Sequence, residues 1–232
     1  MSGDPRAALR ESWERNAAAW IEAVRGGHIP SRRAGTDAAV LEAVLRAPGP
    51  RVLDVGCGEG WLARALAALG REVVGIDGSE DLVRRAREAG GGVFRTLRYD
   101  EVVADPARLG GPFDAAVCNF ALLGAEVAPL LRALGTALAP GGRLVVQTLH
   151  PFTAAGDDPY RDGWRVADFA GFAVPFPARM PWYFRTVGSW LAEARRAGLE
   201  TAAVEEPLDP ATGRPLSLLL VLARPGEAGP EG

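Results

Sequence analysis

Three glycines at alternate positions separate a short apolar segment from an amphipathic one. The apolar segment is 52–55; Gly56, Gly58 and Gly60 follow it, and apolar residues at helical spacing come after Trp61. Glycine permits a sharp backbone turn and allows a ligand to lie against the chain without an intervening Cβ. The N–H groups that open the following helix are then free to hold a polar ligand. The pattern predicts a strand, a ligand-binding turn and a helix.

The side chains around this turn indicate which ligand it suits. A dinucleotide fingerprint requires a further glycine at the position that Trp61 occupies, where an indole would push the helix away from the strand. The carboxylate of Asp54 beside the turn suits an ammonium group. Asp77 ends the next predicted strand, 72–77, and a carboxylate there can accept hydrogen bonds from both hydroxyls of a ribose. A ligand with an amino-acid end and a ribose is S-adenosylmethionine (SAM).

The run Val52-Leu-Asp-Val-Gly-Cys-Gly-Glu-Gly60, followed by Asp77, resembles motif I and the ribose-binding acid of class I SAM-dependent methyltransferases. A second similarity is Leu138-Ala-Pro-Gly-Gly-Arg-Leu-Val145, in which a helix stop precedes a buried strand. The resemblance extends over roughly residues 45–224. The alternative is an ordinary βαβ turn whose glycines serve packing. The complete set of strand, turn, helix and acid makes that alternative the weaker one.

The resemblance implies SAM as methyl donor, S-adenosylhomocysteine (SAH) as product, and cofactor-binding residues along the strand ends. These are Asp54, Gly56, Cys57, Gly58, Gly60, Trp61, Asp77, Gly78, Asp100, Asn119 and Phe120, with Arg33 from the N-terminal segment. Asp100 is placed to accept a hydrogen bond from the adenine amino group, although a carboxylate that caps the short helix from Glu101 is an equal alternative. Arg33, or its neighbour Arg32, could bind the cofactor carboxylate bidentately; a solvated charge pair is the alternative.

In the resembling family the end of the fourth strand lies beside the reacting methyl group. The fourth predicted strand here is 112–119, so Asn119 and Phe120 occupy that place. Some amino-methyltransferases carry Asn-Pro-Pro-aromatic at this point, whereas this chain reads Asn-Phe-Ala-Leu. The departure weakens a claim for methylation of nucleic-acid bases or protein amides.

Catalytic candidates come from the end of the fifth predicted strand and the segment after it. His150 directly follows the strand 143–149, and ligands of open α/β sheets bind at the carboxyl ends of strands. An alcohol or a phenol would benefit from a general base, whereas a neutral amine or a phenolate can react without one. His150 is the first candidate for such a base and Tyr183 the second, with Arg185 as an anion anchor. A histidine that is only hydrogen-bonded in a loop is the alternative.

The elements that must position these residues alternate between strands and helices. Predicted strands are 52–55, 72–77, 93–97, 112–119, 143–149, 199–206 and 216–223, and predicted helices include 4–24, 36–46, 79–89, 122–138 and 186–197. The last two strands are joined without a helix, so they must pair antiparallel. The resemblance implies an α/β fold: a Rossmann-like seven-stranded sheet with its last strand antiparallel and helices on both faces.

We expect a single SAM-dependent methyltransferase domain over residues 1–232. Its parts are an N-terminal helical lid (1–46), a cofactor-binding core (51–150), a substrate insertion (151–185), and a last helix with the terminal hairpin (186–224), followed by a frayed tail from 225. The insertion has no helical or alternating period but is rich in aromatic residues, which argues against disorder. For the lid, the alternative is a helix that merely packs on the domain. For the insertion, the alternative is an apolar cluster that merely covers the sheet.

Composition excludes several other chemistries. The formal net charge is −3 and all 26 basic residues are arginine, which excludes a P-loop, a Schiff base and a lysine nucleophile. Two cysteines and two histidines lack metal-ligand spacing, so no metal is expected. No apolar run is long enough to span a bilayer and the N-terminus lacks a signal pattern, so a cytoplasmic location without a membrane partner is expected.

The predicted function is transfer of a methyl group from SAM to an oxygen or nitrogen nucleophile of a small, partly apolar or aromatic molecule. An RNA or tRNA methyltransferase is the enzymatic alternative, but the arginines are interspersed with acids and form no basic run, so nucleic acid is disfavoured. A SAM-binding protein that no longer transfers methyl is the non-catalytic alternative. A dehydrogenase is disfavoured by Trp61 and the terminal hairpin. Monomer and dimer both stay open.

Overall fold

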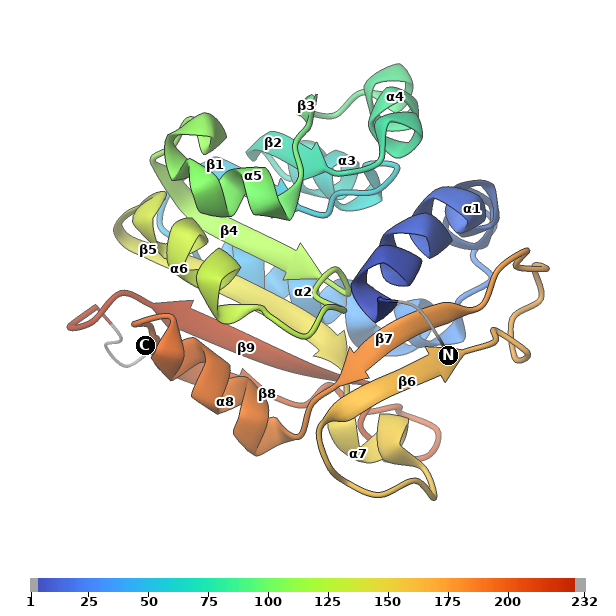
Figure 1. The fold of residues 1–232 in the computed structure, drawn as a ribbon. Coiled ribbons are helices and arrows are strands. Elements are labelled where there is room, and N and C mark those ends of the chain that lie inside the picture. The colour runs from blue at the N-terminus through green and yellow to red at the C-terminus, as the bar shows by residue number, and fades with distance from the viewer. Residues whose placement is uncertain (1–3, 228–232) are drawn as a thin grey trace.

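A seven-stranded sheet forms the centre of the computed structural model, which describes residues 4–227 (Figure 1). Its strands are β1 (Arg51–Val55), β2 (Glu72–Asp77), β3 (Val93–Thr96), β4 (Phe113–Asn119), β5 (Leu138–Leu149), β8 (Glu200–Glu205) and β9 (Ser217–Ala223). They lie in the order β3-β2-β1-β4-β5-β9-β8, and β9 is antiparallel to both of its neighbours. The predicted seven-stranded sheet with its last strand antiparallel is confirmed.

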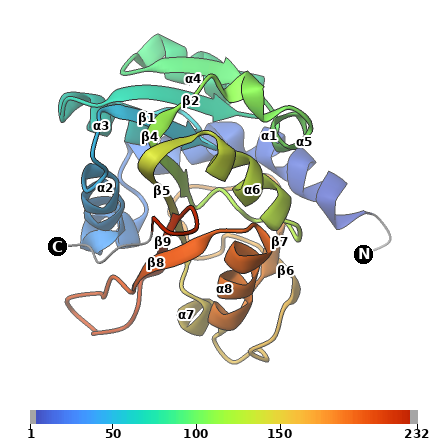
Figure 2. The ribbon, with the colours of Figure 1, turned by 90° about the vertical axis from the view of Figure 1, so that its left-hand side faces the viewer.

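Helices cover both faces of this sheet, as Figure 2 shows from the side. On one face lie α2 (Asp37–Leu45), α3 (Trp61–Ala68) and α4 (Glu80–Ala89); on the other lie α5 (Tyr99–Ala104), α6 (Ala128–Thr136) and α8 (Val187–Arg196). Successive strand residues point to opposite faces, so Val52 packs with the first set and Leu53 with the second, and both are fully buried. Burial on both faces explains why these strands are apolar throughout rather than alternating.

The N-terminal helix α1 (Pro5–Arg25) begins and ends as its sequence predicts. The side chain of Asp4 caps it by accepting from the N–H of Arg6 at 3.0 Å, with Pro5 in the first turn. Figure 1 shows α1 beside β7 (Met180–Phe184), at the end of the sheet toward which β4 runs, and α1 also contacts α4. The helix therefore lies over the carboxyl ends of the central strands.

The prediction that residues 151–185 lack regular structure is wrong. They form a short helix, α7 (Pro151–Ala155), and an antiparallel ribbon of β6 (Gly163–Ala167) and β7. Trp164 lies opposite Tyr183, and their rings meet edge to face at 5.6 Å. Cross-strand aromatic pairs of this kind stabilise a ribbon.

Two helix starts also differ from the prediction. The helix expected from residue 122 begins only at Ala128, because Pro129 favours the first turn of a helix, and residues 120–127 form a loop. The helix predicted over 36–46 is preceded by a π-helical turn, Arg32–Thr36, that runs directly into α2. A short 3₁₀ helix, Pro106–Leu109, leads into β4. The predicted tail from 225 is described only to residue 227, and 228–232 lie outside the described residues.

None of the helices described over residues 4–227 has the length and apolar character needed to cross a bilayer. Within the same residues, histidine, cysteine and carboxylate side chains do not gather in groups of three or more that could hold a metal ion.

Candidate functional site

A cavity of about 880 Å³ lies over the carboxyl ends of β1, β2 and β4, between the sheet, α1 and the β6–β7 ribbon. The volume is within the range of sites that bind small molecules. The predicted cofactor-binding residues that line it are Gly56, Cys57, Gly58, Trp61, Asp77, Gly78, Asp100, Asn119 and Phe120. Asp54, Gly60 and Arg33 do not line it. Most of the residues predicted from the sequence thus line one cavity. The three that do not line it have separate reasons, which are given below.

The glycine turn approaches its neighbours too closely for side chains. Gly56 has φ 74°, and a Cβ on it would lie 2.5 Å from both the Tyr99 hydroxyl and the Ala121 Cβ. Gly58 has φ 55°, and a Cβ there would meet no atom of the described residues within 4 Å, so this part of the turn is open. Gly60 instead serves packing, because a Cβ on it would approach Ala86 to 3.1 Å.

Asp77 joins the end of β2 to the glycine turn. Its Oδ2 accepts from the N–H of Gly58 at 3.0 Å, and its Oδ1 accepts from the N–H of Ser79 at 2.8 Å. Burial raises the pKa of this carboxyl group, and the hydrogen bonds from Ser79 and Gly58 oppose that rise. Each carboxylate oxygen keeps a second lone pair, so Asp77 can still accept from hydroxyl groups in the cavity.

Asp54 is buried next to the turn without reaching the cavity. Its Oδ2 has no hydrogen-bond partner among the described residues. Burial, and then the nearby charge of Asp77, raise the pKa of Asp54 to about 7. An uncompensated buried carboxylate of this kind favours a cation nearby, which is consistent with its predicted role beside an ammonium group.

Arg32, rather than Arg33, lines the cavity. Its Nε donates to Asp37 Oδ1 at 2.8 Å, and its guanidinium lies 4.0 Å over the ring of Trp61. Its Nη1 is buried and has no partner among the described residues. Of the two arginines, Arg32 thus lines the cavity with an unpartnered donor, while Arg33 lies outside the cavity lining.

Two further polar residues of the predicted cofactor site are Asp100 and Asn119. Asp100 lines the cavity but is largely exposed, and its ion pair with Arg98 lowers the pKa of its carboxyl group. The Oδ1 of Asn119 is buried without a partner among the described residues. Phe120 follows in the left-handed region, with φ 51°, and its N–H donates to the carbonyl of Gln147 at 2.8 Å. Such strained backbone at a cavity fits a functional position.

His150, the candidate base, does not line the cavity. It is 4% exposed, its Nε2 lies 2.7 Å from Glu206 Oε1, and its Nδ1 accepts from the N–H of Phe152 at 3.2 Å. Both ring nitrogens are therefore occupied, and His150 caps the N-terminus of α7. The prediction that His150 acts as a base is not carried forward.

Tyr183 and Arg185 also lie outside the cavity lining. The guanidinium of Arg185 is stacked between the rings of Tyr183 and Trp190, at 4.8 and 5.0 Å from their centroids. Its Nη2 donates to the carbonyl of Gly124 at 2.7 Å, so this buried arginine supports the loop after β4. The predictions of Tyr183 as a base and Arg185 as an anion anchor are not carried forward either.

The other half of the cavity is apolar and combines α1 with the insertion. Its lining includes Leu9, Trp13, Trp20, Leu123, Phe169, Phe172, Met180 and Trp182. Trp20 is central: its ring lies 5.6 Å from that of Trp13 and 5.5 Å from that of Phe169. Its Nε1 is buried and has no hydrogen-bond partner within residues 4–227. The apolar stripe of α1 and the aromatic content of the insertion predicted these regions, but no sequence period identified the individual residues.

A glycine turn after β1, an acid after β2 and a seven-stranded sheet with an antiparallel β9 together define the class I methyltransferase fold. Comparison with known proteins agrees with this class. Residues 28–204 match the family described as "Methyltransferase domain". The chain belongs to this family.

Individual relatives match the chain over different lengths. A ubiquinone biosynthesis O-methyltransferase of Xanthomonas axonopodis pv. citri (strain 306) is 39% identical over 124 residues, 50% of this chain and 49% of that protein. The chain thus spans about half the length of the curated relatives it matches. An S-adenosylmethionine dependent methyltransferase from Mesorhizobium loti is similar in structure, with a TM-score of 0.60 and 29% identity over 80% of this chain and 96% of that one.

A third similarity concerns the fold alone. Magnesium protoporphyrin IX methyltransferase from Synechocystis PCC 6803, solved with bound SAM, has a TM-score of 0.60 and 20% identity. The similarity covers 97% of this chain and 99% of that one, so the helical and ribbon additions around the sheet lie within the shared length.

Proposed function

We propose that the protein transfers a methyl group from SAM to a nitrogen or oxygen nucleophile of a small, partly apolar or aromatic molecule. The observation that carries this proposal is the cavity itself, in which the glycine turn and Asp77 face the same space as the aromatic side chains of α1 and the insertion. We also propose that residues 1–232 act as one domain, since the lid and the insertion complete this cavity.

The residues present fit SAM at both of its polar ends. Asp77 would accept from the ribose hydroxyls, and the open side of Gly58 would leave room for the ligand backbone. The unpaired Nη1 of Arg32 would donate to the carboxylate, and the charge of Asp54 would favour the ammonium group. Asp100 would lie near the adenine. When bound, SAM supplies an electrophilic methyl group on a sulfonium, which is already a good leaving group.

The aromatic half would hold the acceptor. Flat apolar surfaces from Trp13, Trp20 and Trp182 favour a planar or aromatic molecule, and the Nε1–H of Trp20 offers it one hydrogen bond. Asn119 Oδ1 could accept from a hydrogen on the nucleophile.

These residues would act mainly by orientation and by excluding water. The apolar lining strips water from the reacting groups, and α1 closes the cavity on one side. Three of the carboxylates that line the cavity are already engaged: Asp77 with the backbone, Asp37 with Arg32, and Asp100 with Arg98. This arrangement favours a nucleophile that reacts without a dedicated base, such as a neutral amine or a preformed phenolate.

Calorimetric titration tests the cofactor part of the proposal. The purified protein is titrated with SAM, SAH and NAD, and SAM and SAH titrations are repeated on Asp77→Ala. We expect SAM and SAH to bind, NAD not to bind, and Asp77→Ala to lose both ligands. Binding of NAD alone, or of none of the three, would reject the proposal. A positive result justifies a screen of planar aromatic amines and phenols with methyl-labelled SAM.

A further inference from the structure

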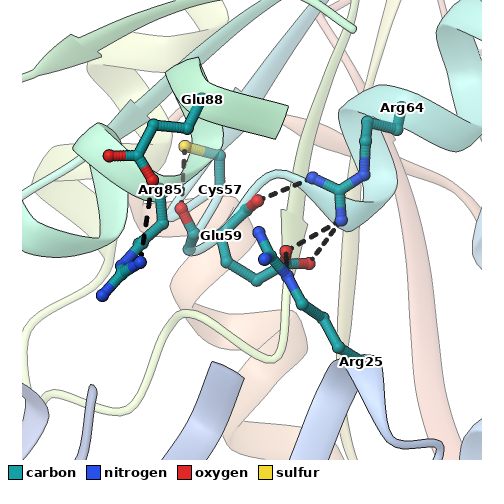
Figure 3. Close-up of polar contacts among 7 residues, drawn as sticks. Arg25, Cys57, Glu59, Arg64, Arg85 and Glu88 are labelled. Carbon is teal, nitrogen blue, oxygen red and sulfur yellow. Dashed lines mark hydrogen bonds and ion pairs between the residues drawn. The ribbon is translucent and has the colours of Figure 1, made fainter. Parts of the chain in front are cut away.

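Glu59 is a nearly buried carboxylate inside the glycine turn, with its side chain 3% exposed. Figure 3 shows it between the guanidinium groups of Arg25 and Arg64. Nε of Arg25 lies 2.6 Å from Glu59 Oε2. Nη2 of Arg64 lies 2.8 Å from both carboxylate oxygens, and its Nη1 donates to the backbone carbonyl of Glu59 at 2.7 Å. Glu59 lines the cavity, but its charge is already matched by these two cations.

The two arginines belong to different parts of the molecule. Arg64 is in α3, the helix that directly follows the glycine turn, so its contact with Glu59 is local. Arg25 is the last residue of α1, the helix that closes the cavity. Elsewhere, α1 is attached to the insertion: Asn16 exchanges two hydrogen bonds with the backbone of Ala178, at 2.8 and 3.0 Å. Arg25 thus joins the lid to the turn that would hold the cofactor.

The number of contacts that each arginine makes with Glu59 determines which of the two ion pairs can open. Removing both cations from Glu59 would leave an unpaired buried charge, which is strongly unfavourable. Arg64 can prevent this alone, because it contacts both oxygens and the backbone of the same residue. Arg25 is 43% exposed, so its guanidinium can move into water at little cost while Glu59 stays paired. The Arg25 contact is therefore the releasable one.

We propose that Glu59 is a positioning residue and that its ion pair with Arg25 latches α1 over the cofactor. The latch holds the C-terminal end of the lid against the glycine turn while the cofactor is bound, and its release allows the cofactor to leave. Its effect is on the residence time of the cofactor, because changes at a binding surface act mainly on the dissociation rate. The inference rests on the proposed function in so far as the cofactor occupies this cavity.

The test compares dissociation of SAH from four forms of the full-length protein. These are the wild type, Arg25→Gln, the conservative Arg25→Lys, and the control Arg15→Gln. Arg15 is in the same helix and pairs only loosely with Glu11, at 3.7 Å and at an exposed site. Dissociation is followed by tryptophan fluorescence after dilution or displacement, at low and high salt, and hydrogen exchange of the α1 amides is measured with and without SAH.

We expect Arg25→Gln to release SAH roughly threefold faster, which corresponds to about 0.7 kcal/mol. Arg25→Lys should restore most of the slow release, and Arg15→Gln should match the wild type. Added salt should accelerate release from the wild type but not from Arg25→Gln. A merely structural ion pair would lower the melting temperature without producing this salt difference. Equal release rates and equal α1 exchange in Arg25→Gln and Arg15→Gln would reject the latch.

Failure of the proposed function gives a different result. If the wild type does not bind SAH at all, the methyltransferase proposal fails, and hydrogen exchange in the free protein still decides about the latch. Faster exchange near the C-terminal end of α1 in Arg25→Gln than in Arg15→Gln would support it, and identical exchange in the two variants would overturn it.

Discussion

The N–H of Gly58 donates to Asp77 Oδ2 at 3.0 Å, so the acid that ends β2 fixes the glycine turn that follows β1. The two strands are adjacent and parallel, and their ends therefore meet at the same edge of the sheet. The same carboxylate also accepts from the N–H of Ser79, the residue that caps α4. One side chain thus organises the ends of two strands and the start of a helix around the cavity.

Replacing Asp77 with asparagine tests this relationship more finely than removal of the side chain. In Asp77→Asn one oxygen becomes an NH₂ group that faces a backbone N–H, so a charge-assisted hydrogen bond worth about 1.5–3 kcal/mol is lost. We expect the calorimetric affinity for SAH to fall at least roughly tenfold. Asp81→Asn is the control, because Asp81 is exposed and pairs with Arg84 on the same helix, α4. An SAH affinity within about twofold of the wild type would contradict the assignment of Asp77.

Asp54 should make the free protein less stable as the pH rises. Its pKa is about 7 in the folded state, against an ordinary value near 3.8. Between those values the folded protein holds a proton that the unfolded chain has released, so the free energy of unfolding falls with rising pH across this window. The loss is complete above pH 7 and is on the order of a few kcal/mol.

Asp54→Asn removes this ionisation, so we expect the variant to be more stable than the wild type at pH 8 and similar to it only at or below about pH 3.8, where both forms of the wild type are protonated. Urea unfolding of both proteins at several pH values measures the difference. The same variant should bind SAM more weakly at pH 8, because the buried negative charge near the cationic ligand is lost. A parallel pH dependence in the two proteins would show that another group is responsible.

Alanine variants at Gly56 and Gly70 distinguish the cost of backbone strain from the cost of steric contact. Both have positive φ, 74° and 82°, but a Cβ on Gly56 would clash with Ala121 and Tyr99, whereas one on Gly70 would meet no atom of residues 4–227 within 4 Å. We expect Gly70→Ala to cost about 1–2 kcal/mol of unfolding free energy and to leave SAH binding unchanged. Gly56→Ala should cost roughly 1–3 kcal/mol more and abolish SAH binding. Equal losses of unfolding free energy in the two variants would mean that the turn can relax around the added methyl group.

The sequence was sufficient to predict a structural feature where a local pattern corresponds to a fixed place in the sheet. The glycine turn and Asp77 were predictable because both follow apolar strands, and adjacent parallel strands bring their ends together. The seven-stranded sheet and the antiparallel β9 followed from the family resemblance and the missing helix between the last two strands. These inferences need only the backbone path, which sequence spacing describes well.

Side-chain roles that depend on distant segments were not predictable in this way. His150 lies at a strand end as expected, but Glu206, distant in the sequence, binds its Nε2. The β6–β7 ribbon escaped prediction because a long connection separates its strands and Pro181 interrupts the strand pattern of β7. Arg32 and Arg33 are neighbours in an unexpected π-helical turn, and no periodicity distinguishes the one that faces the cavity.

Arg32 should recognise the amino-acid end of the cofactor and nothing else. We expect Arg32→Gln to weaken SAH binding at least roughly tenfold, because a charge-assisted hydrogen bond is lost. Binding of 5′-methylthioadenosine, which lacks the amino-acid part, should stay unchanged. Arg33→Gln is the matched control and should leave both affinities unchanged. If Arg32→Gln weakens both ligands equally, its role is to support Trp61, over whose ring it is stacked.

His150 should matter for stability and not for methyl transfer. Its Nδ1 accepts from the N–H of Phe152 at the start of α7, so His150→Ala removes a helix cap and should cost about 1 kcal/mol of unfolding free energy. His150→Asn keeps an acceptor at this position and should recover much of that loss. Because His150 lies outside the cavity lining, both variants should bind SAH like the wild type and transfer methyl at the wild-type single-turnover rate to any acceptor found in the screen. A large fall in that rate in both variants, with SAH affinity and fold intact, would return His150 to the reaction and would require the Glu206 contact to open in the acceptor complex.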